Sequence, residues 1–360
     1  FRGEIVELDE SLEVGGDITL RGDGSLSGNG QDQIRILGTL AGAENSELSV
    51  SDIDNDGAAL RIDASEGRVA VNGFVEETVF TGAPGQTGRL DLYSGTLVDV
   101  TFGLDSVLDT SITSRSVSFY EGLTLEGTTL SLEGSGSQTA TLNVYGDGLY
   151  GTGEVILSAE NRLGTEAVRN QLIFRDVQSG AEALTIDEGI TVRGTGSVQT
   201  SSFTTGDAID INGAVIADDG RLSLDNLGGP LTGILGATSD GVLAFSGSLE
   251  MAEQGVLSLQ VGNAGTGRIE LSGNLNRAGI LALEVATDFT ASLGDEFTII
   301  TASIFGDTFQ GAFQGYEGFD LAGNQAFSLI EDEAAGTLTL RVVTDAEAQT
   351  FINGSGFVAG

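Results

Sequence analysis

Short pairs of apolar residues, most of them separated by one residue, recur along most of the chain at intervals of 22–37 residues. Alternation of this kind is typical of strands with one buried face. A repeat of this length, built of strands and without a helical period, is typical of a solenoid. We therefore predict an all-β protein, a right-handed parallel β-helix (β-solenoid) with a C-terminal antiparallel β cap. The recurring pairs are Leu12/Val14, Ile34/Ile36, Leu60/Ile62, Leu90/Leu92, Val117/Phe119, Leu142/Val144, Leu172/Phe174, Ile209/Ile211, Val242/Phe245 and Ile269/Leu271.

The repeat also predicts which strands lie next to each other. If consecutive pairs stack directly, contacts should join residues roughly 25–30 positions apart, as in the pairs Ile34–Leu60 and Leu90–Val117. Glycine, at 55 of the 360 residues, often follows the strand pairs, where a coil must turn with a positive φ.

Changes in composition divide the chain into four segments. Residues 1–15 form an N-terminal strand and a polar opening coil, 16–286 the parallel β-helix, and 287–345 the C-terminal β cap. The tail, 346–360, follows the cap and is a candidate inter-subunit strand. Phenylalanine is dense in the cap segment, and large aromatic side chains close an open end well. These residues are Phe289, Phe297, Phe305, Phe309, Phe313, Phe319 and Phe327.

The two ends of the chain carry the candidate assembly residues. The terminal coil of a solenoid exposes backbone donors and acceptors and needs a cap or a partner. We therefore predict that the tail pairs with the first coil of another copy, so that the protein forms a homopolymer. The residues of this predicted contact are Ile5, Leu8, Leu12 and Val14 in the first coil, and Phe351, Ile352, Phe357 and Val358 in the tail.

Charge restricts the partners. The formal net charge is −38, and all 15 basic residues are Arg. A surface with this negative charge repels nucleic acid and anionic membranes. In addition, no apolar run of the sequence is long enough to insert into a bilayer. Salt or divalent cations would screen the repulsion between the carboxylates. We therefore expect an extracellular or cell-surface location, with divalent cations or surface glycans as further partners.

One acidic motif has the spacing of a calcium loop. Asp52, Asp54 and Asp56 occupy positions 1, 3 and 5, Gly57 occupies position 6, and Asp63 occupies position 12. Three carboxylates on a tight turn provide the hard oxygen ligands that Ca²⁺ prefers. The alternative is a polar Asx turn, because the flanking segments read as strands and not as the helices of an EF-hand.

The stretch 271–313 resembles the C-terminal end of secreted bacterial β-helix repeat proteins, such as autotransporter passengers and related surface proteins. A G-x-L coil at Gly279–Leu281 is followed by a G-D-x-F-x-I-I strand at Gly294–Ile300 and a G-x-F turn at Gly311–Phe313. The resemblance implies an exported, surface-associated right-handed β-helix and no particular activity.

Three functions fit the sequence. The first is a non-enzymatic structural protein whose subunits associate head-to-tail into a surface filament or coat. The second is a monomeric adhesin that binds a surface or a glycan. The third is a polysaccharide-degrading enzyme, for which the chain offers 53 Asp and Glu residues but no His, Cys, Lys or Trp. The missing residue types favour a non-enzymatic protein.

Overall fold

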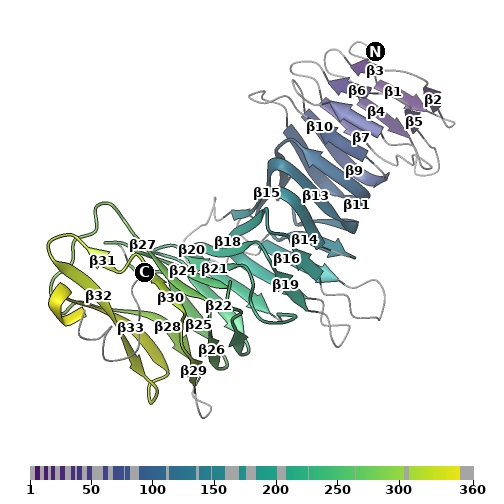
Figure 1. Ribbon diagram of the computed structural model, residues 1–360. Helices are drawn as coiled ribbons and strands as arrows, with labels where there is room; N and C mark the ends of the chain where they lie inside the picture. Colours follow the sequence, from purple (N-terminus) through teal and green to yellow (C-terminus); the bar gives the residue numbers. More distant parts are fainter. Residues whose placement is uncertain are drawn as a thin grey trace. The chain divides into compact units, whose positions relative to one another are not determined.

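The structure is a computed structural model in which two compact units are distinguished. The first unit comprises residues 1–192 and 201–207, and the second comprises 193–200 and 208–360 (Figure 1). The structure describes residues 5–8, 12–14, 18–20, 25–28, 34–36, 39–42, 47–50, 60–63, 68–76, 78–81, 89–110, 113–134, 138–146, 148–158, 170–175, 184–200, 208–225, 227–263, 265–303 and 308–348.

The described part of the first unit consists of β-strands. They are β1 (Ile5–Leu8), β2 (Leu12–Val14), β3 (Ile18–Leu20), β4 (Ser25–Gly28), β5 (Ile34–Ile36), β6 (Thr39–Gly42), β7 (Glu47–Val50), β8 (Leu60–Asp63), β9 (Arg68–Glu76), β10 (Thr78–Thr81), β11 (Arg89–Gly103), β12 (Ser106–Asp109), β13 (Arg115–Glu133), β14 (Ala140–Tyr145), β15 (Gly148–Ser158), β16 (Asn170–Arg175), β17 (Leu184–Ile186) and the start of β18 (Ile190–Thr200). Every pair of strands whose register is described in this unit is parallel, as stacked coils of a β-solenoid require.

From β7 onward, these pairs form three ladders in the described part of the unit. Ladder 1A joins β7, the first part of β9 and of β11, β12, and the last part of β13 and of β15. Ladder 1B joins the second part of β9, the middle of β11, the first part of β13, β14 and β16. Ladder 1C joins β8, β10, the end of β11, the middle of β13, the start of β15, and β17.

Long strands such as β11 therefore belong to all three ladders and turn between them. The register of β11 shifts between Leu92 and Ser94 and again between Val98 and Val100. Gly95 has a φ of 147° and Asp99 a φ of 48° at these corners. Glycine takes such angles without strain. The positive φ predicted for the glycines that follow the apolar pairs is found at Gly146, with a φ of 90°, but not at Gly213, Gly262 or Gly273.

Leucine and phenylalanine fill the interior of the first unit. In ladder 1B, Leu97, Phe119, Val144 and Phe174 are stacked in register from coil to coil, and each is 0% exposed. Phe102 contacts both Phe80 and Phe119 edge to face, with ring centroids 5.6 Å apart. The core is thus a continuous column inside the coils.

The predicted stacking is confirmed for several of the recurring pairs. Leu12 and Val14 lie opposite Ile34 and Ile36. The pairs beginning at Val117, Leu142 and Leu172 lie opposite one another in ladder 1B.

Two predicted contacts are wrong. Leu60 pairs with Thr78 and not with Ile34, and Leu90 pairs with Val69 and Ser106 and not with Val117. The cause is that one coil contributes to three ladders. Successive apolar pairs along the chain can therefore lie in different ladders and do not always meet.

Within the second unit, most of the described strand pairs are also parallel. Its strands are the rest of β18, β19 (Ile209–Ile211), β20 (Ala214–Asp225), β21 (Ile234–Ala237), β22 (Val242–Ser246), β23 (Leu249–Glu250), β24 (Val256–Val261), β25 (Arg268–Leu271), β26 (Leu275–Arg277), β27 (Ile280–Val285), β28 (Glu296–Ala302), β29 (Phe309–Gly311), β30 (Gly315–Glu317), β31 (Asp320–Leu321), β32 (Gln325–Asp332) and β33 (Thr337–Thr344). Ladder 2A joins the first part of β20 to β21, β24, β27 and β30. Ladder 2B joins the last part of β20 to β22, β25 and the end of β28. Ladder 2C joins β23, β26 and β29.

One recurring pair is displaced by one residue in ladder 2B. Leu243, and not Val242, is buried opposite Ile269, and Phe245 lies opposite Leu271. Their partners on the other side are Leu222 and Leu224 of β20.

Antiparallel strands close ladder 2B. β33 pairs with β28, and β32 pairs with β33, both antiparallel. This is the antiparallel pairing predicted for 287–345, although parallel pairing also reaches β30 within that segment. Phe289, Phe297 and Phe327 form a cluster here, with ring centroids 5.7–6.2 Å apart.

An ion pair links the last coils to the antiparallel strands. Arg277 of β26 donates to Glu331 of β32 at 2.6 Å, and its side chain is only 10% exposed. The same guanidinium lies 5.7 Å from the ring centroid of Phe309, within the range of a cation–π contact.

A single helical turn, 345–348, follows β33. Thr344 and Glu347 form a capping box, in which each backbone N–H is bound by the other side chain. Ala348 is 4% exposed and belongs to a cluster with Ala326 and Val343. The first residues of the predicted tail therefore pack on their own subunit, while 349–360 lie outside the described residues.

The corner glycines yield a test of the stacked coil. A Cβ atom at Gly95 would overlap the carbonyl oxygen of Gly73 in the preceding coil, whereas one at Gly127 would meet no atom within 4 Å. We expect the substitution Gly95→Ala to lower the free energy of unfolding by about 3 kcal/mol or more. The substitution Gly127→Ala should lower the free energy of unfolding by only about 1 kcal/mol, because the sole cost is that Ala must adopt the left-handed backbone of Gly127, which has a φ of 69°. Chemical denaturation measures both, and equal costs would contradict the close coil contact.

Candidate ligand-binding groove

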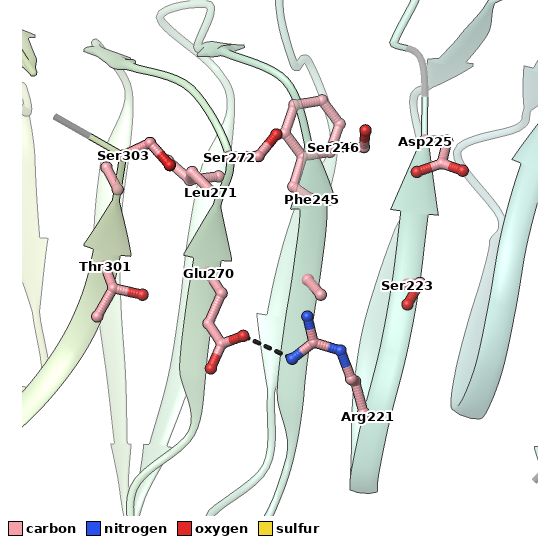
Figure 2. A pocket seen from close by; sticks show the side chains of 12 residues that line it. Arg221, Ser223, Asp225, Phe245, Ser246, Glu270, Leu271, Ser272, Thr301 and Ser303 are labelled. Carbon is pink, nitrogen blue, oxygen red and sulfur yellow. Dashed lines mark hydrogen bonds and ion pairs between the residues drawn. The ribbon is translucent and has the colours of Figure 1, made fainter. Parts of the chain in front are cut away.

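An open groove of about 480 Å³ crosses the outer side of ladder 2B in the second unit. Four neighbouring strands, β20, β22, β25 and β28, form its base (Figure 2). Three charged residues, a set of hydroxyl side chains and a few apolar groups line it. The lining residues are Arg221, Ser223, Asp225, Ala244, Phe245, Ser246, Glu270, Leu271, Ser272, Thr301, Ala302 and Ser303.

The strand register arranges the outward side chains in two rows. One row runs Ser223, Ala244, Glu270 and Thr301. The other begins with Asp225 and Ser246 at the ends of β20 and β22, and Ser272 and Ser303 follow directly after β25 and β28. Neighbouring strands lie about 4.8 Å apart, so successive residues of each row follow one another at that spacing, and the second row has a polar residue at every step. The intervening residues Leu222, Leu224 and Leu243 point into the core and are 0% exposed.

An ion pair bounds one side of the groove. Arg221 of β20 reaches across β22 and donates to Glu270 of β25 at 2.5 Å (Figure 2). The two side chains are 57% and 36% exposed. Their charges neutralise each other, and Ala244 of the intervening strand β22, which is 8% exposed, also lines the groove.

Asp225 stands on the opposite side of the groove. Among the residues that the structure describes, it has no ion-pair or hydrogen-bond partner, and partial burial raises the pKa of its carboxyl above the ordinary value of 3.8. It is therefore the one charge of the lining that the described part of the chain leaves without a counter-charge.

The hydroxyl groups near Asp225 are available to a ligand. Ser272 Oγ accepts a hydrogen bond from the backbone N–H of Gly247 at 2.7 Å, which leaves its own proton free to donate. No hydrogen bond to another described residue occupies the hydroxyls of Ser223, Ser246, Thr301 or Ser303. The groove thus offers several donors and acceptors beside one carboxylate.

None of the groove residues was predicted from the sequence to be a binding residue, although Phe245 and Leu271 were among the recurring apolar pairs. The signal was present as three copies of a polar–apolar–small pattern, at 223–225, 270–272 and 301–303, and a fourth segment, 244–246, that begins with Ala in place of the polar residue. This pattern can be recognised as one surface only when the ladder of each strand is known. The apolar pairs alone do not show which strands share a ladder.

The predicted calcium residues are described only in part. Asp52, Asp54 and Asp56 lie outside the described residues, and Asp63 is the last residue of β8, whose backbone pairs with β6 and β10. Across the described ranges, no group of three or more Asp, Glu, His or Cys residues is placed to hold a metal ion. Calcium at the 52–63 motif stays a prediction.

The predicted assembly residues are described only in part. Ile5 and Leu8 lie in β1, which pairs with β4, and Leu12 and Val14 lie in β2, which pairs with β5. The tail residues Phe351, Ile352, Phe357 and Val358 lie outside the described residues.

Comparison with known proteins adds no family to this picture. No family model matches the chain, and no curated protein matches it. Within the part that the structure describes, no helix has the length and apolar character needed to cross a membrane.

The environment of Asp225 predicts a pH-dependent effect on stability. Because its pKa is raised in the folded state, ionisation of the carboxyl favours the unfolded chain as the pH rises through the folded pKa. We expect Asp225→Asn to stabilise the protein at pH 7, by less than about 1 kcal/mol because solvent screens the site. Below the ordinary value of 3.8 the gain should vanish. Melting curves of both proteins across this range test the expectation, and a gain only at low pH would contradict it.

Proposed function

We propose that the chain is a non-enzymatic, extracellular structural protein, a β-solenoid subunit that associates head-to-tail with copies of itself into a surface filament or coat. The observation that carries the proposal is the edge of the first coil. Among the described strands, β1, β2 and β3 pair on one side only, with β4, β5 and β6. Their other edges present backbone donors and acceptors that a further strand can pair with.

The end of the second unit supplies a complementary surface. Ladder 2B ends in the antiparallel strands β33 and β32, but ladders 2A and 2C end, as far as the structure describes them, in the parallel strands β30 and β29. An end-to-end contact of this kind uses different surfaces on the two copies. Heterologous contacts that do not close into a ring produce open fibres.

Composition supports the extracellular and non-enzymatic parts of the proposal. A net charge of −38 favours a saline or calcium-containing setting, in which ions screen the carboxylates. The absence of His, Cys and Lys removes the usual nucleophile and acid–base sets. Of the two carboxylates in the groove, Glu270 is held by Arg221, which argues against a pair with separate acid and base roles.

A second candidate function is a monomeric adhesin that binds a surface or a glycan. The groove on ladder 2B favours it, because the groove concentrates hydroxyl groups and an uncompensated carboxylate on one outer face. The two candidates differ in their prediction for the purified protein, which is filaments in one case and single particles in the other.

Truncation of the tail tests the assembly proposal. We propose that 349–360, with Phe351 and Phe357, pairs with the first coil of the next copy. Deleting 349–360 keeps Ala348 in its cluster with Ala326 and Val343, so the subunit should remain folded. Electron microscopy should show filaments with a regular axial repeat for the intact chain and single particles for the truncated chain.

A milder variant separates loss of the contact from loss of the fold. Phe351→Ser together with Phe357→Ser keeps the chain length and should also abolish filaments, with an unchanged circular dichroism spectrum. Normal filaments from the truncated chain would overturn the role of the tail. An intact chain that stays monomeric at all concentrations would overturn the proposal as a whole.

A further inference from the structure

We propose that the groove on ladder 2B binds a saccharide chain that carries protonated amino groups. This proposal names the ligand of the second candidate function and uses residues of the second unit only. It holds whether or not the subunits associate end to end.

The charges of the groove indicate a cationic group on the ligand. Arg221 and Glu270 neutralise each other at 2.5 Å, so Asp225 is left as the net charge of the lining. A partly buried carboxylate gains most from a partner that is itself charged and donates hydrogen bonds. An ammonium group on the ligand meets both conditions.

The hydroxyl rows indicate that the rest of the ligand is polyhydroxylated. Ser246, Ser272 and Ser303 continue the row that Asp225 begins, one on each successive coil (Figure 2). A serine hydroxyl both donates and accepts, as does each hydroxyl of a sugar. Their repetition at about 4.8 Å suits an extended chain laid across the strands, rather than a compact molecule.

Other ligand classes fit the groove less well. A peptide that adds as a strand needs an open sheet edge, and β22 and β25 are paired on both sides. Peptide side chains would also need apolar pockets, whereas Phe245 is 4% exposed and Ala244 8%. Nucleic acids and acidic polysaccharides are repelled by the net charge of −38.

Calorimetric titration of the full chain tests the proposal with defined probes. The first probe is a glucosamine tetramer, and the second is its fully N-acetylated form, both at about pH 6, which lies above the ordinary pKa of a carboxyl and below that of an amine. We expect one site per chain for the amino form and at least about tenfold weaker binding of the acetylated form, which lacks the charged donor. Asp225→Asn should remove this preference, and Ser246→Ala should weaken both probes about two- to fivefold.

Matched controls separate the groove from general attraction to an acidic protein. Asp240→Asn removes the same charge from an exposed turn of the same unit, outside the groove lining, and should leave binding unchanged. Tetralysine, a cation without sugar hydroxyls, should bind without dependence on Asp225 or Ser246. The proposal is overturned if the glucosamine tetramer does not bind. It is also overturned if Asp240→Asn weakens binding as much as Asp225→Asn, or if tetralysine shows the same dependence on both groove residues.

Discussion

A strand of a stacked coil satisfies its backbone hydrogen bonds only through the coil before it and the coil after it. In-register parallel pairing between coils is therefore the interaction on which the rest of this structure depends. It requires the chain to turn sharply at each corner, where Gly95 takes a positive φ and lies directly against Gly73 of the preceding coil. It also brings equivalent side chains into columns, so that Phe119 meets Val144 inside the first unit. Among the described strands, β1, β2 and β3 pair on one side only, and the proposed assembly rests on their other edges.

The outward side chains have no part in that pairing or in the core, and they are the positions at which a solenoid can acquire function. On ladder 2B these positions carry Asp225, Glu270 and a row of serines, while Leu222, Leu243 and Ile269 between them fill the core. Stacking repeats each outward position on the next coil, so that a short sequence pattern becomes an extended polar surface. The groove is a consequence of the register as much as of the residues.

Much of the fold follows from local sequence signals, because alternation and corner glycines are local properties. The stacking of Val117 against Leu142 was predictable from the repeat. The partner of Leu90 was not, since one coil holds several apolar pairs and their spacing does not say which pairs share a ladder. A high density of phenylalanine does not by itself identify the cap. Phe297 and Phe327 do cluster there, yet Phe102 and Phe119 pack inside the coils of the first unit. The groove could not be predicted for the same reason as the register, because the residues that lie opposite each other on its neighbouring strands are 21, 26 and 31 positions apart in the sequence.

Cross-linking of engineered cysteine pairs tests the parallel stacking most directly, and the chain has no cysteine of its own. Ser116 and Thr141 lie opposite each other on neighbouring coils of ladder 1B, 25 positions apart in the sequence. Thr124 is much closer to Ser116 in the sequence but lies in ladder 1C. With a short bifunctional thiol reagent, the stacked coil predicts rapid cross-linking of Ser116→Cys with Thr141→Cys and little of Ser116→Cys with Thr124→Cys. The reverse result, which a hairpin-based sandwich or propeller would give, would contradict the β-solenoid.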